Sequence, residues 1–321
     1  MKRTTRHLLV NLLQSMRPAY SLAEQRFCET YLEPTFGKPD THGNYILSVG
    51  DNPTIAFTAH TDTVHRQEGV QTLSVEDNFV TTMTGSCLGA DCTTGLWLML
   101  GMIEAGIEGV YIAHAAEEIG GIGSSNLVKD NPSWLKNIQV CLSFDRFGTD
   151  SVITHQGGMR TASNDFAVSL AGILDMPQLK PDSTGTYTDS MEYSSIIPEC
   201  SNLSVGYYDQ HTARESQDIL FAERLLERLC EADWSALKVV RDPTQPEEYD
   251  DDHWGSYTND SDEVDEEAVN AITRLLLDRP RIVAELLYDY GLTVDVLCDE
   301  LQVDYVDQKY YSDEYFAEHY Y

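Results

Sequence analysis

Four short apolar segments of this 321-residue chain lead directly into side chains that bind metal ions, and this pattern constrains the fold most. The segments are residues 55–59 before His60 and Asp62, 110–113 before Glu117 and Glu118, 140–144 before Asp145, and 203–207 before His211. Apolar runs of this length are typical of buried strands. In open α/β sheets the carboxyl ends of the strands form the active crevice. We therefore expect an α/β fold with a mixed, mostly parallel twisted sheet flanked by helices.

The helical stretches between these segments agree with that fold. Residues 94–105 are apolar nearly all round, which predicts a buried helix. Residues 5–34 are predicted to be helical, broken at Pro18, with Leu8, Leu12, Leu13 and Met16 on one face of the first part. Residues 44–49 are predicted to form a strand, and residues 218–229 a helix with a leucine-rich stripe.

The charge of the chain predicts two regions. The net charge is −32, and residues 1–240 hold 30 acidic and 16 basic residues, a net of −14. Residues 241–321 hold 23 acidic and 5 basic residues, a net of −18, and begin with Pro243, Pro246 and the acidic run 247–252. We predict a catalytic domain at 1–240 and an acidic, tyrosine-rich C-terminal segment at 241–321. That segment would combine a solvated linker with short helices, either as a disordered tail or as a docking site for a protein partner.

Composition excludes several classes of function. An acidic surface of this strength repels nucleic acid and anionic lipid. The chain has no run of 18 apolar residues, so no membrane span is expected. Its seven cysteines include no CxxC pair and follow no secretory signal, which predicts reduced thiols and a cytoplasmic location.

The candidate ligands match what a two-metal hydrolase requires. Two zinc ions about 3.5–4 Å apart activate a shared water and polarise a carbonyl group. One carboxylate must bridge the ions, and each ion takes an imidazole and a further carboxylate. His60 and His211 supply the imidazoles. Asp145 and Glu118 supply the terminal carboxylates, and Asp91 the bridging carboxylate. Glu117 is left as the general base, and Asp62 can accept the second N–H of His60 and fix its tautomer.

Each of these signals has a plainer interpretation when it is taken alone. A His-x-Asp at a strand end is more often structural, a Glu-Glu pair is usually a solvated face, and Asp91 could be a helix N-cap. Their joint appearance in this order favours the functional interpretation. We expect His114 to be a core histidine rather than a neighbour of the ligands. Asp189 has either a role near the site or a place in a turn.

Six segments resemble one enzyme family. The segments are DTHGNYI (40–46), TAHTDTV (58–64), LGADCTTG (88–95), AAEEIGGIGS (115–124), SFDRFG (143–148) and GYYDQHTARE (206–215). They resemble the motifs of the co-catalytic zinc exopeptidases, which include bacterial leucyl aminopeptidase, tripeptidase T, the carboxypeptidase G group and the tetrahedral aminopeptidases. The resemblance covers about residues 5–235.

The resemblance implies that His60, Asp91 and Asp145 hold one zinc ion, and that Asp91, Glu118 and His211 hold the other, with Co²⁺ or Mn²⁺ as substitutes. Cys92 departs from the pattern, because the family has a second Asp there. Asp145 and His211 are 66 positions apart, and His60 and Asp91 are 31 apart, which is too close for the lid domains of several members. The single-domain leucyl aminopeptidase type fits better.

The leading interpretation is therefore an aminopeptidase that acts on small peptides. The abundant carboxylates favour a substrate ammonium group, whereas a carboxypeptidase needs a cation for the terminal carboxylate. Arg160 and Arg146 keep the carboxypeptidase alternative open. An amidohydrolase acting on N-acyl amino acids would use the same metals, and a non-catalytic binding protein on this fold is a further alternative.

Overall fold

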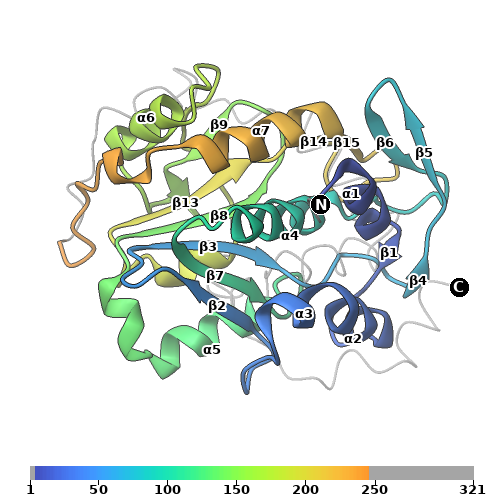
Figure 1. Ribbon diagram of the computed structural model, residues 1–321, viewed down its shortest axis with the longest axis horizontal. Helices are drawn as coiled ribbons and strands as arrows, with labels where there is room; N and C mark the ends of the chain where they lie inside the picture. Colours follow the sequence, from blue (N-terminus) through green and yellow to red (C-terminus); the bar gives the residue numbers. More distant parts are fainter. Residues whose placement is uncertain (1–3, 246–321) are drawn as a thin grey trace, which may run out of the picture. The chain divides into compact units, whose positions relative to one another are not determined.

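A seven-stranded mixed sheet forms the centre of the computed structural model, which describes residues 4–245 (Figure 1). The strand order across the sheet is β12-β9-β13-β8-β3-β7-β2. In that order the strands are Lys180–Asp182, Ser151–Ile153, Glu199–Ser204, Val140–Arg146, Ile55–His60, Gly109–His114 and Tyr45–Val49. The four strands from β13 to β7 are mutually parallel, while β2 and β9 run antiparallel to their neighbours β7 and β13. The expected α/β class with a mixed, mostly parallel sheet is confirmed.

The two faces of the sheet carry separate apolar cores. Successive side chains of a strand point to opposite faces. Phe57 and Tyr111 accordingly belong to the larger core, whereas Ala56, Val110 and Cys141 belong to the smaller one. Because both faces are covered, the central strands are buried along nearly their whole length, which explains their continuous apolar sequence.

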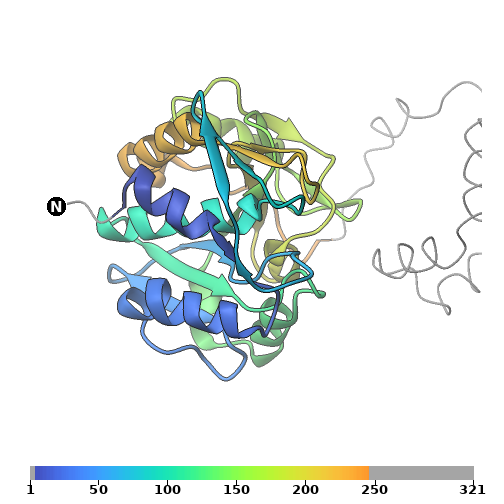
Figure 2. The same cartoon turned by 90° about the vertical axis from the view of Figure 1, so that its right-hand side faces the viewer.

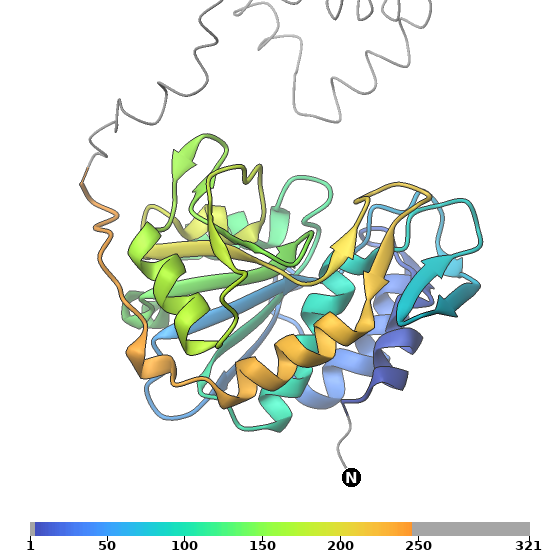
Figure 3. The same cartoon turned by 90° about the horizontal axis from the view of Figure 1, so that it is seen from above.

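Helices cover both faces. The larger core includes residues of α1 (Arg6–Leu13), α4 (Ala90–Glu104), α6 (Asn164–Ile173) and α7 (Ile219–Glu231). Figures 1 and 3 show α4 and α7 side by side on this face. The smaller core includes residues of α5 (Ile122–Asp130) and of the 3₁₀ segments η2 (Ser133–Asn137) and η3 (Asp189–Tyr193). The remaining short helical segments are α2 (Leu22–Phe27), the π-helical η1 (Cys28–Leu32), α3 (Glu33–Phe36) and η4 (Trp234–Ala236).

A second, smaller sheet brings distant segments together, as Figure 2 shows. Its strand order is β14-β15-β6-β5, and the strands are Tyr207–Tyr208, Ser216–Asp218, Phe79–Thr82 and Leu73–Glu76. Two further ladders pair β1 (Ser15–Met16) with β4 (Gly69–Val70), and β10 (His155–Gln156) with β11 (Met159–Arg160). The small sheet holds the loop between β14 and β15, which contains His211, near the start of α4.

Helix α4 lies unusually close to the main sheet. A Cβ atom on Gly95 would lie 2.3 Å from the carbonyl oxygen of Phe144 and 3.0 Å from the Cβ of Ala59. Only glycine permits this approach, because a side chain would meet backbone atoms of β8. The close contact brings Asp91, in the first turn of α4, towards the ends of β3 and β8.

One expectation about local structure is wrong, and one alternative interpretation is excluded. Met16 does not lie on the first helix, since α1 ends at Leu13 and Met16 pairs with Gly69 in a strand. Its apolar side chain continues the helical spacing by coincidence, and sequence periodicity cannot detect a partner strand 53 positions away. Asp91 is not a helix N-cap, because Gly89 occupies that position in a left-handed conformation with φ of 68°.

The described residues belong to one compact unit, Met1–Glu247. The acidic segment 241–321, with its predicted short helices, lies almost wholly outside the described residues, so the boundary near residue 241 stays a prediction. Within residues 4–245 no helix is long and apolar enough to cross a membrane.

Candidate metal centre

The ends of the parallel strands bring the predicted site residues together. His60 ends β3, Asp145 lies near the end of β8, and Glu117 and Glu118 follow β7. Asp91 comes from α4, and His211 from the loop after β14. Neighbours within this group approach one another to between 3.0 and 3.9 Å through side-chain atoms. Direct contacts within this cluster join residues up to 120 positions apart.

One half of the cluster surrounds His60, which is 1% exposed. Its Nε2 lies 3.5 Å from Oδ1 of Asp145 and 3.9 Å from Oε2 of Glu117. Asp145 is held by its backbone: its N–H donates to Oδ1 of Asn202 at 3.0 Å, and its carbonyl oxygen accepts from the Tyr207 hydroxyl at 2.9 Å. Neither Asn202 nor Tyr207 was singled out from the sequence.

The other half surrounds His211, whose Nε2 lies 3.0 Å from Oδ2 of Asp91 and 3.5 Å from Oε1 of Glu118. The ligand atoms of these three residues all lie within 4.8 Å of one another, as a shared metal ion requires. Within residues 4–245 two further groups meet this criterion, and both include His60. One adds Asp91 and Cys92, and the other adds Glu117 and Glu118.

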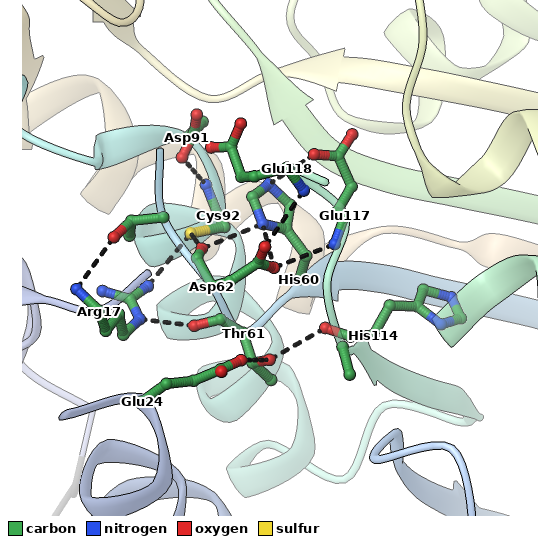
Figure 4. A network of polar contacts seen from close by, with 12 residues as sticks. Arg17, Glu24, His60, Thr61, Asp62, Asp91, Cys92, His114, Glu117 and Glu118 are labelled. Atoms are coloured by element: carbon green, nitrogen blue, oxygen red, sulfur yellow. Dashed lines mark hydrogen bonds and ion pairs between the residues drawn. The ribbon is translucent and has the colours of Figure 1, made fainter. Parts of the chain in front are cut away.

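Asp62 connects the two halves through backbone contacts (Figure 4). Its carboxylate accepts the backbone N–H of Glu117 and that of Glu118, both at 3.1 Å. Its Oδ1 also lies 3.4 Å from Nδ1 of His60, and its carbonyl oxygen lies 3.1 Å from the same nitrogen. Asp62 can therefore orient the imidazole of His60 and fix the turn that carries the two glutamates.

A buried arginine contacts the residue after β3 and the first turn of α4, and sequence reasoning missed it. Arg17 is fully buried, and its Nε donates to the carbonyl oxygen of Thr61 at 2.7 Å. Its Nη2 donates to Oγ1 of Thr93 at 2.8 Å and to Sγ of Cys92 at 3.1 Å (Figure 4). The guanidinium also stacks over the ring of Phe27, 4.1 Å from its centroid. Cys92, which departs from the family pattern, thus contacts a buried cation that binds both β3 and α4.

The electrostatics of the cluster favour a bound cation. Burial raises the pKa of Glu117 and of Glu118 above their ordinary range. Burial opposes a charged His211, but its hydrogen bond to Asp91 and the nearby carboxylate of Glu118 raise its pKa to about 11. Oε1 of Glu118 is buried without a hydrogen-bond partner. Carboxylate and imidazole donors in this proportion suit a divalent cation such as zinc, which can replace the protons that the cluster would otherwise retain.

His114 and Asp189 differ in their surroundings. His114 is fully buried, its ring nitrogens lie 3.3 Å from Asn44 Oδ1 and 3.3 Å from Tyr193 Oη, and burial lowers its pKa to about 3. These contacts are those of a satisfied core histidine. Asp189 opens η3 and is 1% exposed, and neither carboxylate oxygen has a hydrogen-bond partner. Burial raises its pKa to about 8, so Asp189 is an interior acid rather than part of an exposed turn.

A polar pocket adjoins the cluster at Asp145. It is lined by Arg146, Gln156, Thr186, Tyr187, Asn202 and Gln210, among others. Arg146 is already paired, because its Nη2 lies 3.2 Å from Oδ2 of Asp182 and 2.7 Å from Oγ1 of Thr184. Its charge is therefore largely neutralised within the protein.

No protein family and no curated protein matches this sequence. Solved structures do match its fold. The aminopeptidase PepT from Bacillus cereus superposes with a TM-score of 0.58 and 16% identity, over 71% of this chain and 98% of that one. A tripeptidase from Staphylococcus aureus gives 0.57 and 14%, over 71% and 97% of the two chains. The TET1 peptidase of Pyrococcus horikoshii gives 0.56 and 15%, over 71% and 100%. At these identities the likeness shows a shared fold.

Proposed function

We propose that this chain is a two-zinc exopeptidase that removes the N-terminal residue of short peptides. The observation that carries the proposal is the approach of His211 to Asp91 and Glu118, beside the pair of His60 and Asp145, at the carboxyl ends of parallel strands. One ion would be held by His60, Asp91 and Asp145, and the other by Asp91, Glu118 and His211. When bound, the ions would polarise the scissile carbonyl and lower the pKa of water.

Glu117 is the candidate general base. It lies beside the ligand Glu118, and its Oε2 is 3.9 Å from His60, but the two ligand sets do not require it. Burial raises the pKa of Glu117, and a carboxylate with a raised pKa accepts a proton more readily. Glu117 would take a proton from the attacking water and deliver it to the leaving amine. Asp62 would fix the turn that carries Glu117 and Glu118 by accepting their backbone N–H groups.

Three observations favour an aminopeptidase over a carboxypeptidase. The cluster is rich in carboxylates, which attract a substrate ammonium group. Arg146, the arginine nearest the ligands in sequence, is paired with Asp182 and is poorly placed to bind a terminal carboxylate. The solved structures of similar fold also include proteins described as aminopeptidases and a tripeptidase.

A peptide panel tests the proposal. Tripeptides with free or acetylated N-termini and free or amidated C-termini would be incubated with the full chain, before and after chelation and after addition of Zn²⁺ or Co²⁺. We expect cleavage only with a free N-terminus, loss of activity on chelation, and recovery with metal. A requirement for a free C-terminus would indicate a carboxypeptidase, and a preference for acylated substrates an amidohydrolase. A metal-loaded protein that cleaves nothing would contradict the enzymatic function.

A further inference from the structure

Glu215 is a buried acid that the proposed chemistry does not use. It lies four residues after His211 and directly before β15, and its exposed fraction is 0%. Its carboxylate accepts three backbone N–H groups: Oε2 accepts from Leu88 at 3.0 Å and Gly89 at 3.3 Å, and Oε1 from Ala90 at 2.7 Å. A side chain that is distant in sequence therefore accepts the free backbone N–H groups at the start of α4.

The start of α4 depends on this contact. The first N–H groups of a helix have no partner within the helix, and a side chain at the N-cap usually accepts one of them. Gly89 occupies the N-cap and has no side chain to offer. A carboxylate there also interacts favourably with the positive end of the helix dipole. Glu215 thus caps α4, although it lies 125 positions from Ala90 in the sequence.

The contact joins two segments that carry candidate ligands. Asp91 follows Ala90 in the first turn of α4, and His211 lies in the loop that ends at Glu215. Within that loop the backbone hydrogen bonds connect Thr212 with Asp209 and with Glu215 itself, and so do not reach α4. Asp62 has a parallel arrangement, because it accepts the backbone N–H groups of the turn that carries Glu117 and Glu118.

We propose that Glu215 is a positioning residue, which holds Asp91 and His211 at the separation that one metal ion requires. This inference depends on the proposed metal centre. The ion that needs both segments, held by Asp91, Glu118 and His211, should be the more sensitive to Glu215. The other ion, held by His60, Asp91 and Asp145, has only Asp91 from the two segments that Glu215 joins. Its binding should therefore depend less on Glu215.

Glu199 offers a matched control. It is also fully buried, and it accepts backbone N–H groups from Ser163, Val240 and Arg241. It begins β13, at the end of the sheet opposite to the cluster, where it is paired with Val140. Glu199→Gln and Glu215→Gln therefore remove the same kind of contact, but only the second lies beside candidate ligands.

The test measures metal binding in the full-length protein. Metal-free wild type, Glu215→Gln and Glu199→Gln would be titrated with Zn²⁺ against a competing chelator, and with Co²⁺ while its visible absorption is recorded. We expect Glu215→Gln to bind the second ion about 10- to 100-fold more weakly, as for partners of metal ligands elsewhere, and to alter the absorption of the second Co²⁺. Glu199→Gln should lower the unfolding temperature but bind both ions as wild type does.

Several results would overturn the inference. Two ions bound by Glu215→Gln at wild-type affinity would show that Glu215 does not position ligands. Equal weakening in Glu199→Gln would show that the effect comes from general destabilisation. If Glu215→Gln does not fold, Glu215→Asp retains the charge with a shorter reach, and normal binding of the second ion by that variant would also contradict the inference. A wild type that binds no ion would instead contradict the proposed function itself.

Discussion

In the proposed function, two adjacent glutamates of one turn have different roles. Glu118 lies 3.5 Å from His211 and belongs to a compact ligand group, whereas Glu117 lies towards His60. Asp62 fixes the backbone of both residues, and the ligand atoms of the two glutamates still lie within 4.8 Å of each other and of His60. The proposed assignment of Glu118 as a ligand and Glu117 as the base rests on this difference in the histidine that each contacts.

Replacing Glu117 by Gln should separate catalysis from metal binding. The variant is isosteric and removes a group outside the two ligand sets, so metal content should stay near that of wild type. The value of kcat should fall by about 10²-fold or more, the usual scale for loss of acid–base catalysis. Metal analysis and steady-state kinetics check this, with Glu118→Gln as the matched variant that should lose metal. Loss of metal from Glu117→Gln would make Glu117 a ligand instead.

Asp189 predicts how stability of the metal-free protein depends on pH. Its pKa is about 8 in the folded state, because it is buried, and about 4 in the unfolded chain. The folded state therefore binds more protons between these values, and the free energy of unfolding should fall as pH rises from about 4 to 8. Asp189→Asn should flatten this decline in chemical denaturation experiments with chelator present. Asp165→Asn, which changes an exposed carboxylate, should leave the slope unchanged; equal slopes for Asp189→Asn and wild type would contradict the prediction.

At the residue scale, the sequence predicts the candidate ligands better than the buried residues that hold the ligand-bearing segments in place. His60, Asp91 and Asp145 stand out because metal-binding side chains at strand ends are uncommon. Arg17 is a single charge outside the recognised segments, and Glu215 ends one of them, 206–215, without any pattern that gives its contact. Their burial results from contacts with segments 75 and 125 positions away, which no local pattern contains.

At the scale of elements, helix α4 depends on a glycine at its contact with the sheet. Gly95→Ala would place a methyl group 2.3 Å from the carbonyl oxygen of Phe144, so the helix must shift. We expect a loss of about 1–3 kcal/mol in the free energy of unfolding, together with weaker metal binding, because α4 carries Asp91. Denaturant unfolding and metal titration measure the two effects.

Gly172 provides the control for that substitution. It lies in α6, and a Cβ atom there would meet nothing within 4 Å. Gly172→Ala should leave stability unchanged or raise it by up to about 1 kcal/mol, since alanine favours a helix. A Gly95→Ala variant as stable and metal-competent as Gly172→Ala would show that the approach of α4 to the sheet is not required.

The elements that the sequence predicts are those with long apolar patterns. The buried strands β3, β7 and β8 and the helices α4 and α7 come from apolar patterns long enough to be recognised. The small sheet does not, because strands of two to four residues such as β14 and β5 are set by their partners. Met16 illustrates the same limit, as its backbone pairing with Gly69 overrides a helical spacing of side chains.

At the scale of the whole molecule, the folded body includes contacts from Arg241, one residue past the predicted boundary at 240. Glu199 accepts the backbone N–H groups of Val240 and Arg241 at 2.9 and 3.1 Å. The Arg241 side chain donates to the carbonyl oxygens of Ser194 and Pro198, both at 2.9 Å. These contacts place residues 240–241 within the folded body, so a cut between the two predicted regions should come after residue 245.

Two truncated proteins test this boundary. A chain ending at residue 245 should fold, bind metal and cleave peptides with kcat/KM within about tenfold of the full chain, a change of ~1.4 kcal/mol. A chain ending at residue 237 should lose about 3 kcal/mol or more of stability, because Glu199 keeps its buried charge but loses two donors. Equal unfolding free energies would show that the contacts of Arg241 are dispensable. Inactivity of a folded, metal-loaded chain ending at residue 245 would assign the acidic segment a part in the active site.

The most direct test of the account is anomalous diffraction from crystals of the full chain grown with Zn²⁺, recorded on both sides of the zinc absorption edge. We predict two zinc peaks about 3.5–4 Å apart, with Asp91 between them, His60 and Asp145 on one, and Glu118 and His211 on the other. A single peak, two peaks without Asp91 between them, or no peak within the cluster would contradict the two-metal centre on which the proposed function rests.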